Sequence, residues 1–156
     1  MKLTPQEEYG LRCLLQVARE APCPAVPPVP IERISEAEGL GYEHTAKMMR
    51  LLRRGGVVVS TRGARGGFHL ARPAEKISLW DALRALDPPL YDDGFCDAFS
   101  GQQECCAHLS TPCSLKALWR FVGTTLQDGL SRITLADLLT GAMPEPSPPI
   151  PAGAAK

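Results

Sequence analysis

Two short apolar stripes separated by a glycine turn constrain the fold of this 156-residue chain more than any other feature. The first stripe ends at Gly39, and the second begins after Gly41 and ends at Gly55. Their helically spaced members are Ile31, Ile34, Ala37, Met48, Leu51 and Leu52. Glycine commonly ends a helix because it adopts the left-handed backbone at no steric cost. Two short helices joined by a tight turn are typical of a helix-turn-helix.

A β-hairpin is predicted directly after the second stripe. Residues 57–61 are β-branched and strand-like, residues 62–67 form a turn rich in glycine and arginine, and residues 68–71 can return as a second strand. A hairpin in this position would be the wing of a winged helix-turn-helix.

Further helices are expected on both sides of this unit. Thr4 and Glu7 form a capping-box pair at the start of a helix over residues 5–20. Residues 22–30 contain five prolines, so this connector can be neither a helix nor a central strand. A capped helix begins at Ser78 and ends at the prolines that follow Asp87. The expected fold is mostly α with a small β-hairpin, and residues 1–89 would form the winged helix-turn-helix domain.

Charge is concentrated in the predicted helix-turn-helix and wing, although 17 basic and 17 acidic residues cancel over the whole chain. Between Gly41 and Arg72, seven Lys or Arg residues accompany one acid, Glu43, which gives 7 − 1 = +6. This distribution is typical of a DNA-binding surface, whereas a merely solvated face would explain only single residues such as Arg53. The start of a recognition helix reads base edges, and nearby cations contact phosphates or the minor groove. The candidate contacts are Tyr42, His44, Thr45, Lys47, Arg50, Arg62 and Arg65.

Residues 90–113 form an irregular loop that contains four of the six cysteines. Thiolates are the preferred ligands of iron–sulfur clusters and also bind zinc. The spacing of Cys96, Cys105 and Cys113 is wider than the gaps of about two to four residues usual in structural zinc sites. We therefore predict a 2Fe–2S or 4Fe–4S cluster on these three thiolates. A cluster-free redox thiol pair and a structural zinc site are the alternatives.

The fourth ligand of this cluster stays open on residue chemistry alone. Adjacent cysteines rarely bind one metal together, so one of Cys105 and Cys106 is expected to be a spectator. His108 within the loop, or Glu8 of the partner subunit, could complete the set.

Residues 114–142 are predicted to provide a dimerisation helix and a short C-terminal segment. The helix has an apolar face too broad for a solitary appendage, formed by Leu115, Leu118, Trp119, Val122 and Leu126. Pairing with the same helix of a second chain would bury this face, and packing on the chain's own DNA-binding domain is the alternative. The tail, residues 143–156, is rich in proline and alanine and is expected to be disordered.

Other function classes lack support in the sequence. No apolar run approaches the ~20 residues that cross a bilayer, and the N-terminus lacks the apolar core of a signal peptide. A cytoplasmic location without a membrane partner is expected, and clustered cysteines there are more often ligands or redox groups than disulfides. No nucleophile-and-base set is evident, so we do not expect an enzyme.

Several segments together resemble the Rrf2 family of regulators, which has members of the IscR, RirA and NsrR types. These segments are MKLTPQEEYGLRCLLQVA, YEHTAKMMRLLRRGGVVVSTRGARGGFHLARPAEKISLWDAL, the cysteine loop and ITLADLL, and they extend over residues 1 to about 140. The resemblance implies a homodimer with one winged helix-turn-helix per chain, crossed C-terminal helices and an iron–sulfur cluster between the two chains.

The resemblance also implies roles for individual residues. Family cluster cysteines map to Cys96, Cys105 and Cys113, and family DNA contacts map to Tyr42, His44, Thr45 and Arg62. Two departures are a longer cysteine loop and Lys116 in place of the IscR-type histidine, since a protonated lysine is a poor iron ligand. Glu8 matches an acidic residue that some NsrR-like members extend to the cluster, which makes it the preferred fourth ligand, with Cys106 or His108 as alternates.

The predicted function is a sequence-specific DNA-binding transcriptional regulator, expected to be a repressor. It would sense iron–sulfur, nitric oxide or redox status through the cluster. The alternatives are a cluster-free thiol–disulfide switch and, from another class, a small iron–sulfur electron-transfer protein.

Overall fold

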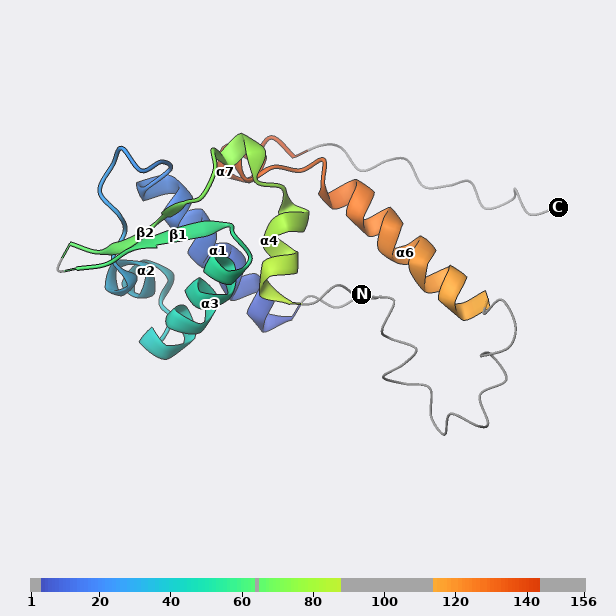
Figure 1. Cartoon of the computed structure of the whole chain (residues 1–156), viewed down its shortest axis with the longest axis horizontal. Coiled ribbons are helices and arrows are strands. Elements are labelled where there is room, and N and C mark those ends of the chain that lie inside the picture. Colours follow the sequence, from blue (N-terminus) through green and yellow to red (C-terminus); the bar gives the residue numbers. More distant parts are fainter. Residues whose placement is uncertain (1–3, 64, 88–113, 144–156) are drawn as a thin grey trace.

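The computed structural model describes residues 4–63, 65–87 and 114–143, and it confirms a mostly α-helical winged helix-turn-helix with a two-stranded hairpin (Figure 1). The hairpin pairs β1 (Val58–Thr61) with β2 (Gly67–Leu70), and η1 (Ala74–Lys76) is a short 3-10 helix. The α-helices are α1 (Pro5–Glu20), α2 (Ile31–Glu38), α3 (Tyr42–Arg54), α4 (Leu79–Leu86), α6 (Ser114–Leu130) and α7 (Leu135–Thr140). The predicted cysteine loop and almost all of the predicted tail lie outside the described residues.

Helix α1 starts at the predicted capping box and supplies the centre of the core. The Thr4 amide donates to Glu7 Oε2 at 2.7 Å, and the Glu7 amide donates to Thr4 Oγ1 at 3.2 Å. Cys13, Leu14 and Val17 are fully buried on this helix. Burial of a side chain such as Leu14 contributes about 1.5–3 kcal/mol to the stability of the fold. Helices α2, α3 and α4 all pack on α1, which is therefore the central helix of the domain.

The helix-turn-helix is formed by α2 and α3. Helix α2 ends at Gly39, whose φ of 62° lies in the left-handed region that favours glycine. Helix α3 then buries Met48, Met49 and Leu52 against the core. These apolar contacts fix the rotation of α3 about its own axis, and therefore decide which of its residues face solvent.

The hairpin is held to the domain by the proline-rich connector. Val29 exchanges two backbone hydrogen bonds with Phe68, at 3.0 and 2.9 Å, so it extends the sheet edge by one bridge. A Cβ at Gly67 would overlap the carbonyl oxygen of Val29, so glycine permits this close approach. His69 is buried, and its Nε2 donates to the carbonyl oxygen of Val26 at 2.8 Å. The wing is thus anchored at its base.

The C-terminal helices behave differently from one another. Helix α6 extends away from the domain, whereas α7 packs back on α1 and η1 (Figure 1). The Leu79 amide donates to the Ile133 carbonyl at 2.8 Å, and the Leu135 amide donates to the Ile77 carbonyl at 2.8 Å. Leu135 is buried in the core. The last part of the predicted dimerisation segment therefore packs with the DNA-binding core. No helix among the described residues is long and apolar enough to cross a membrane.

Candidate nucleic-acid interface

The start of α3 is set by hydrogen bonds around the preceding turn. The carbonyl oxygen of Gly41 accepts from the Thr45 amide at 3.0 Å and from Thr45 Oγ1 at 3.2 Å. The Ser35 hydroxyl donates to the carbonyl oxygen of Leu40. Thr45 is fully buried, so its side chain supports the turn and is not presented to a ligand.

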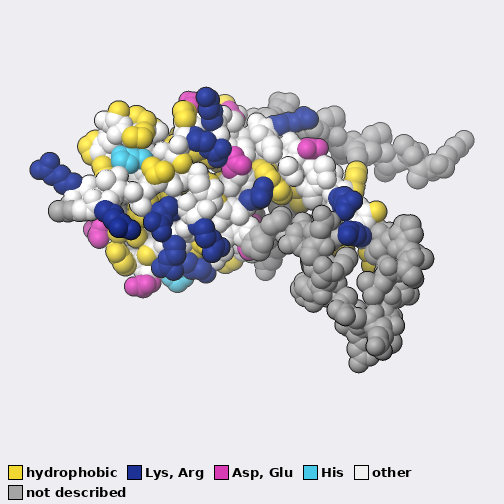
Figure 2. Space-filling model, in the orientation of Figure 1, with side chains coloured by type: hydrophobic (Ala, Val, Ile, Leu, Met, Phe, Trp, Pro, Cys, Tyr) yellow, Lys and Arg dark blue, Asp and Glu magenta, His cyan; other side chains and the backbone are white. Residues whose placement is uncertain are grey.

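The other predicted contacts on α3 face solvent. Tyr42 is 52% exposed, and His44, Lys47 and Arg50 are also exposed. Lys47 and Arg50 lie three residues apart and therefore share one side of the helix. Figure 2 shows Lys and Arg side chains gathered over α3. Most of the DNA contacts predicted on α3 thus lie on an exposed, positively charged surface.

The wing adds two cations to this surface. Arg62 and Arg65 are both exposed in the turn between β1 and β2, and Figure 2 shows basic side chains near the free end of the hairpin. Arg72 differs, because its Nη2 lies 3.3 Å from Asp81 Oδ2. Most of the segment's positive charge is therefore available to a polyanion.

The predicted cluster ligands cannot be placed together, because Cys96, Cys105, Cys106, Cys113 and His108 lie outside the described residues. Their candidate partner Glu8 is exposed on α1. Within the described part of the chain, no group of three or more His, Cys, Asp or Glu side chains is arranged to hold a metal ion.

The two described cysteines differ in exposure. Cys13 is buried in the core, and burial raises the pKa of its thiol to about 11. It therefore remains protonated at neutral pH and is unsuited to act as a ligand or nucleophile. Cys23 is exposed in the connector.

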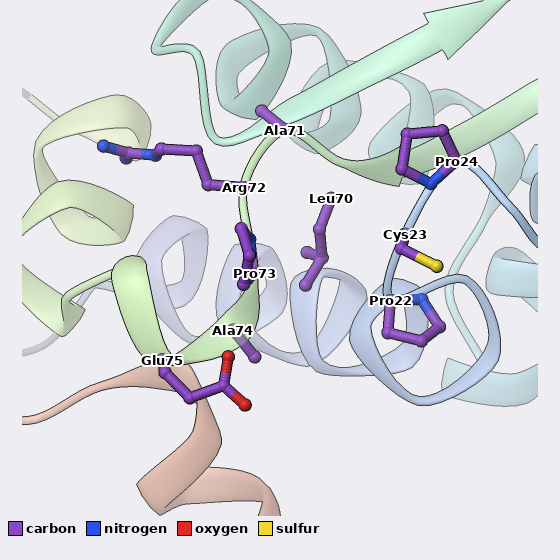
Figure 3. A pocket seen from close by; sticks show the side chains of 9 residues that line it. All are labelled: Pro22, Cys23, Pro24, Leu70, Ala71, Arg72, Pro73, Ala74 and Glu75. Atoms are coloured by element: carbon purple, nitrogen blue, oxygen red, sulfur yellow. The ribbon is translucent and has the colours of Figure 1, made fainter.

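A shallow cavity that the sequence did not indicate lies where the connector meets the end of β2 (Figure 3). Its volume is about 290 Å³. Pro22, Cys23, Pro24 and Leu70 line it together with residues 71–75. The charged side chains of the lining, Arg72 and Glu75, extend in different directions in Figure 3, so they do not converge on one point. The cavity lacks the convergent polar groups typical of a small-molecule site.

Comparison with known proteins identifies close relatives. The sequence model of the Rrf2 family, described as an iron-dependent transcriptional regulator, matches residues 3–141. The chain is 33% identical over 145 residues to the protein rrf2 of Nitratidesulfovibrio vulgaris, covering 91% of this chain and 89% of that protein. Its structure is similar to IscR of T. potens, with 29% identity, a TM-score of 0.63 and coverage of 92% and 89% of the two chains. It is also similar to the oxidised form of Staphylococcus aureus CymR, with 27% identity, a TM-score of 0.60 and coverage of 89% and 96%.

Proposed function

The chain belongs to the Rrf2 family of transcriptional regulators, and we propose that it binds operator DNA as a homodimer through α3 and the β1–β2 wing. Family membership makes it a helix-turn-helix regulator of transcription and not an enzyme. One observation carries the assignment of the DNA surface. Six cations of α3 and the wing are exposed, and none has an ion-pair partner among the described residues: Lys47, Arg50, Arg53, Arg54, Arg62 and Arg65.

The proposed contacts divide by position. Tyr42 and His44 at the start of α3 read base edges in the major groove, and Lys47 and Arg50 contact phosphates. Arg62 and Arg65 of the wing reach a phosphate or the minor groove. Thr45 takes no direct part, because its side chain is buried.

The second copy of the chain is proposed to pair through α6. This helix carries three large apolar side chains of the predicted face that are 41–51% exposed, namely Leu115, Leu118 and Trp119. Burying them against the same helix of a partner removes apolar surface from water. A two-fold dimer with one α3 per subunit would recognise a pseudo-palindromic operator.

The sensing group is proposed to be an iron–sulfur cluster bound by Cys96, Cys105 and Cys113, with Glu8 of the partner subunit as fourth ligand. The donor set fits, because thiolates are preferred by iron–sulfur clusters and Glu8 offers an exposed carboxylate. A bound cluster would supply a metal centre that reacts with nitric oxide or oxidants and responds to iron supply. If the protein has two conformations that bind the cluster with different affinity, gain or loss of the cluster would shift their populations. The affinity for the operator would change with them. Cys106 and His108 remain alternate ligands.

A cluster-free thiol switch is the second candidate. It is supported by the similarity to CymR, a protein whose structure has been solved in an oxidised form. In this mechanism a cellular oxidant would take two electrons and two protons from a pair of thiols, and Cys105 or Cys106 would form a disulfide with Cys96 or Cys113.

The DNA surface is tested by the double substitution R62A/R65A. Binding of the protein to an operator duplex would be measured by fluorescence anisotropy over a range of salt concentrations. We expect weaker binding and a salt slope reduced by about 2, because each lost phosphate contact lowers the slope by about 1. The exposed Arg19 of α1 lies outside the basic segment, so R19A is the control. Unchanged affinity and salt slope in the double variant would mean that the wing does not contact DNA.

The sensing group is tested separately by metal and sulfide analysis of protein purified without oxygen. Stoichiometric iron and sulfide, lost on Cys96, Cys105 or Cys113 substitution, would support the cluster. Protein that holds no iron after reconstitution, but loses DNA affinity reversibly on oxidation, would support the thiol switch. Zinc without sulfide would point to a structural site.

A further inference from the structure

Arg12 of α1 contacts the end of α2 through two hydrogen bonds. Its Nε donates to Glu38 Oε2 at 2.9 Å, and its Nη2 donates to the Glu38 carbonyl oxygen at 2.6 Å. The Glu38 side chain is only 11% exposed, whereas that of Arg12 is 38% exposed. One guanidinium therefore satisfies both a nearly buried carboxylate and an orphan carbonyl at a helix C-terminus.

This contact lies immediately before the turn of the helix-turn-helix. Glu38 is the last residue of α2, Gly39 makes the left-handed turn, and Gly41 is the N-cap of α3. The exposed residues Tyr42 and His44 follow directly. Together with the packing of α3 on α1, the position of Glu38 relative to α1 therefore helps to set where the proposed base-reading end of α3 lies.

A second ion pair joins the same two helices and provides an internal comparison. Arg33 Nε of α2 lies 3.1 Å from Glu20 Oε1 of α1, and the two side chains are 60% and 32% exposed. This pair involves the last residue of α1 and the third residue of α2, and no backbone group of the turn takes part. Solvent screens an exposed pair of this kind, so it contributes little to stability.

We propose that Arg12 is a positioning residue for operator recognition, an inference that rests on the proposed DNA-binding function. Arg12 holds the turn against α1 and thereby fixes the start of α3. Base-edge hydrogen bonds require donor–acceptor distances of about 2.7–3.2 Å, so a small displacement of α3 breaks them. Phosphate contacts by flexible Lys and Arg side chains tolerate that displacement. Loss of Arg12 therefore lowers specificity more than general DNA affinity.

The test compares R12A, R12K and E38Q with the matched variants R33A and E20Q. Each protein is titrated with a duplex enriched by the wild type from a random-sequence pool, and with a random duplex. We expect the ratio of specific to nonspecific affinity to fall at least about tenfold in R12A and E38Q, since each base contact contributes about 1–3 kcal/mol of discrimination. R33A and E20Q should keep the wild-type ratio.

The sign of the effect separates positioning from simple electrostatics. R12A removes a positive charge and E38Q removes a negative charge, so long-range attraction to DNA changes in opposite directions in the two variants. Positioning predicts that specific affinity falls in both. R12K retains the charge, but an ammonium cannot reproduce the planar fork of a guanidinium, so its ratio should also fall.

Thermal melting of each variant identifies effects of reduced stability. If R12A does not fold, R12K and E38Q still test the proposal. Wild-type ratios in folded R12K and E38Q would overturn the inference. A wild-type protein that enriches no sequence from the pool would instead overturn the proposed function, and the inference with it.

Discussion

Helices α3 and α6 are both amphipathic and have similar lengths, 13 and 17 residues, but their apolar sides meet different surroundings. Helix α3 buries Met48, Met49 and Leu52 within its own chain and presents charge to solvent. Helix α6 leaves Leu115 and Leu118 of its apolar face at 51% and 49% exposure. An amphipathic pattern thus specifies that a helix needs a partner surface, but not whether that surface belongs to the same chain.

The largest effect should come from removing an apolar contact that only a second copy can complete. Substitution W119A is expected to cost about 2 kcal/mol per subunit, and so about 4 kcal/mol in a dimer with two copies. Sedimentation equilibrium would show this as a dissociation constant raised more than about 100-fold. T124A is the control, because Thr124 is exposed and lies five residues, or about 140°, around the helix. A dissociation constant unchanged by W119A would mean that α6 does not form the dimer interface.

The next largest effect should come from a substitution on the buried side of α3, which packs within its own chain. Leu52 is fully buried, so L52A should lower the free energy of unfolding by about 3 kcal/mol. Urea unfolding would measure the change against R53A, an exposed neighbour expected to shift it by less than about 0.5 kcal/mol. Equal effects of the two substitutions would contradict the burial that distinguishes α3 from α6.

A smaller effect is expected on the charged side of α3. K47A and R50A should each weaken binding by about 1 kcal/mol on all sequences and lower the salt slope by about 1. Both should leave the unfolding midpoint nearly unchanged. Anisotropy titrations at several salt concentrations would measure this, and a slope equal to that of the wild type would exclude a phosphate contact for that residue.

The smallest effect concerns the cap of α7, the helix that packs on α1 and η1. The amide and hydroxyl of Thr134 donate to Asp137 Oδ2 at 2.8 and 2.7 Å, and they lower the pKa of that carboxyl below its ordinary value of 3.8. The ionised form is therefore favoured in the folded state. Its contribution to stability is complete above the unfolded pKa and is lost as the pH falls through the folded pKa.

Urea unfolding of the wild type and D137N over the acid range would measure this contribution. The difference in stability between the two proteins should shrink as the pH falls. A difference that stays constant with pH would mean that the Asp137 charge does not contribute.

Elements that depend on local signals could be predicted from the sequence. Capping boxes and apolar spacing place α1 and α4 with bounds close to those observed. The two hairpin strands differ slightly from the prediction: β1 begins at Val58, one residue later than predicted, and β2 lies one residue earlier, at Gly67–Leu70. Local capping and backbone geometry decide such elements, so a short stretch of sequence contains the necessary information.

The burial of Thr45 could also have been found. Thr45, Met48, Met49 and Leu52 follow the spacing of one helix face, and all four are buried. Placement of Thr45 near the helix start favoured a base contact, but the rotation of α3 is set by its apolar side. The packing of the apolar side of α3, and not the position of Thr45 near the helix start, therefore determines that Thr45 is buried.

Contacts between residues far apart in the chain leave no comparable pattern in the sequence. Arg12 and Glu38 are 26 residues apart, and neither forms a recognisable local motif with the other. Leu135 reaches the core from beyond α6, whereas the sequence predicts that residues 114–142 belong with the dimerisation helix. The bridge between Val29 and Phe68 occurs between prolines at a sheet edge, where a missing backbone donor is tolerated. Each depends on tertiary packing that residue type alone does not specify.

The backbone hydrogen bonds that join Leu79 to Ile133 and Leu135 to Ile77 close a long loop of chain. In polymer terms, the entropy lost on closing such a loop grows with the logarithm of its length, by about 0.6 kcal/mol for each doubling. Insertions or deletions between α4 and Ile133 therefore alter the stability of the core only slightly. The chain can change the length of the segment that contains its clustered cysteines while the DNA-binding core keeps its fold.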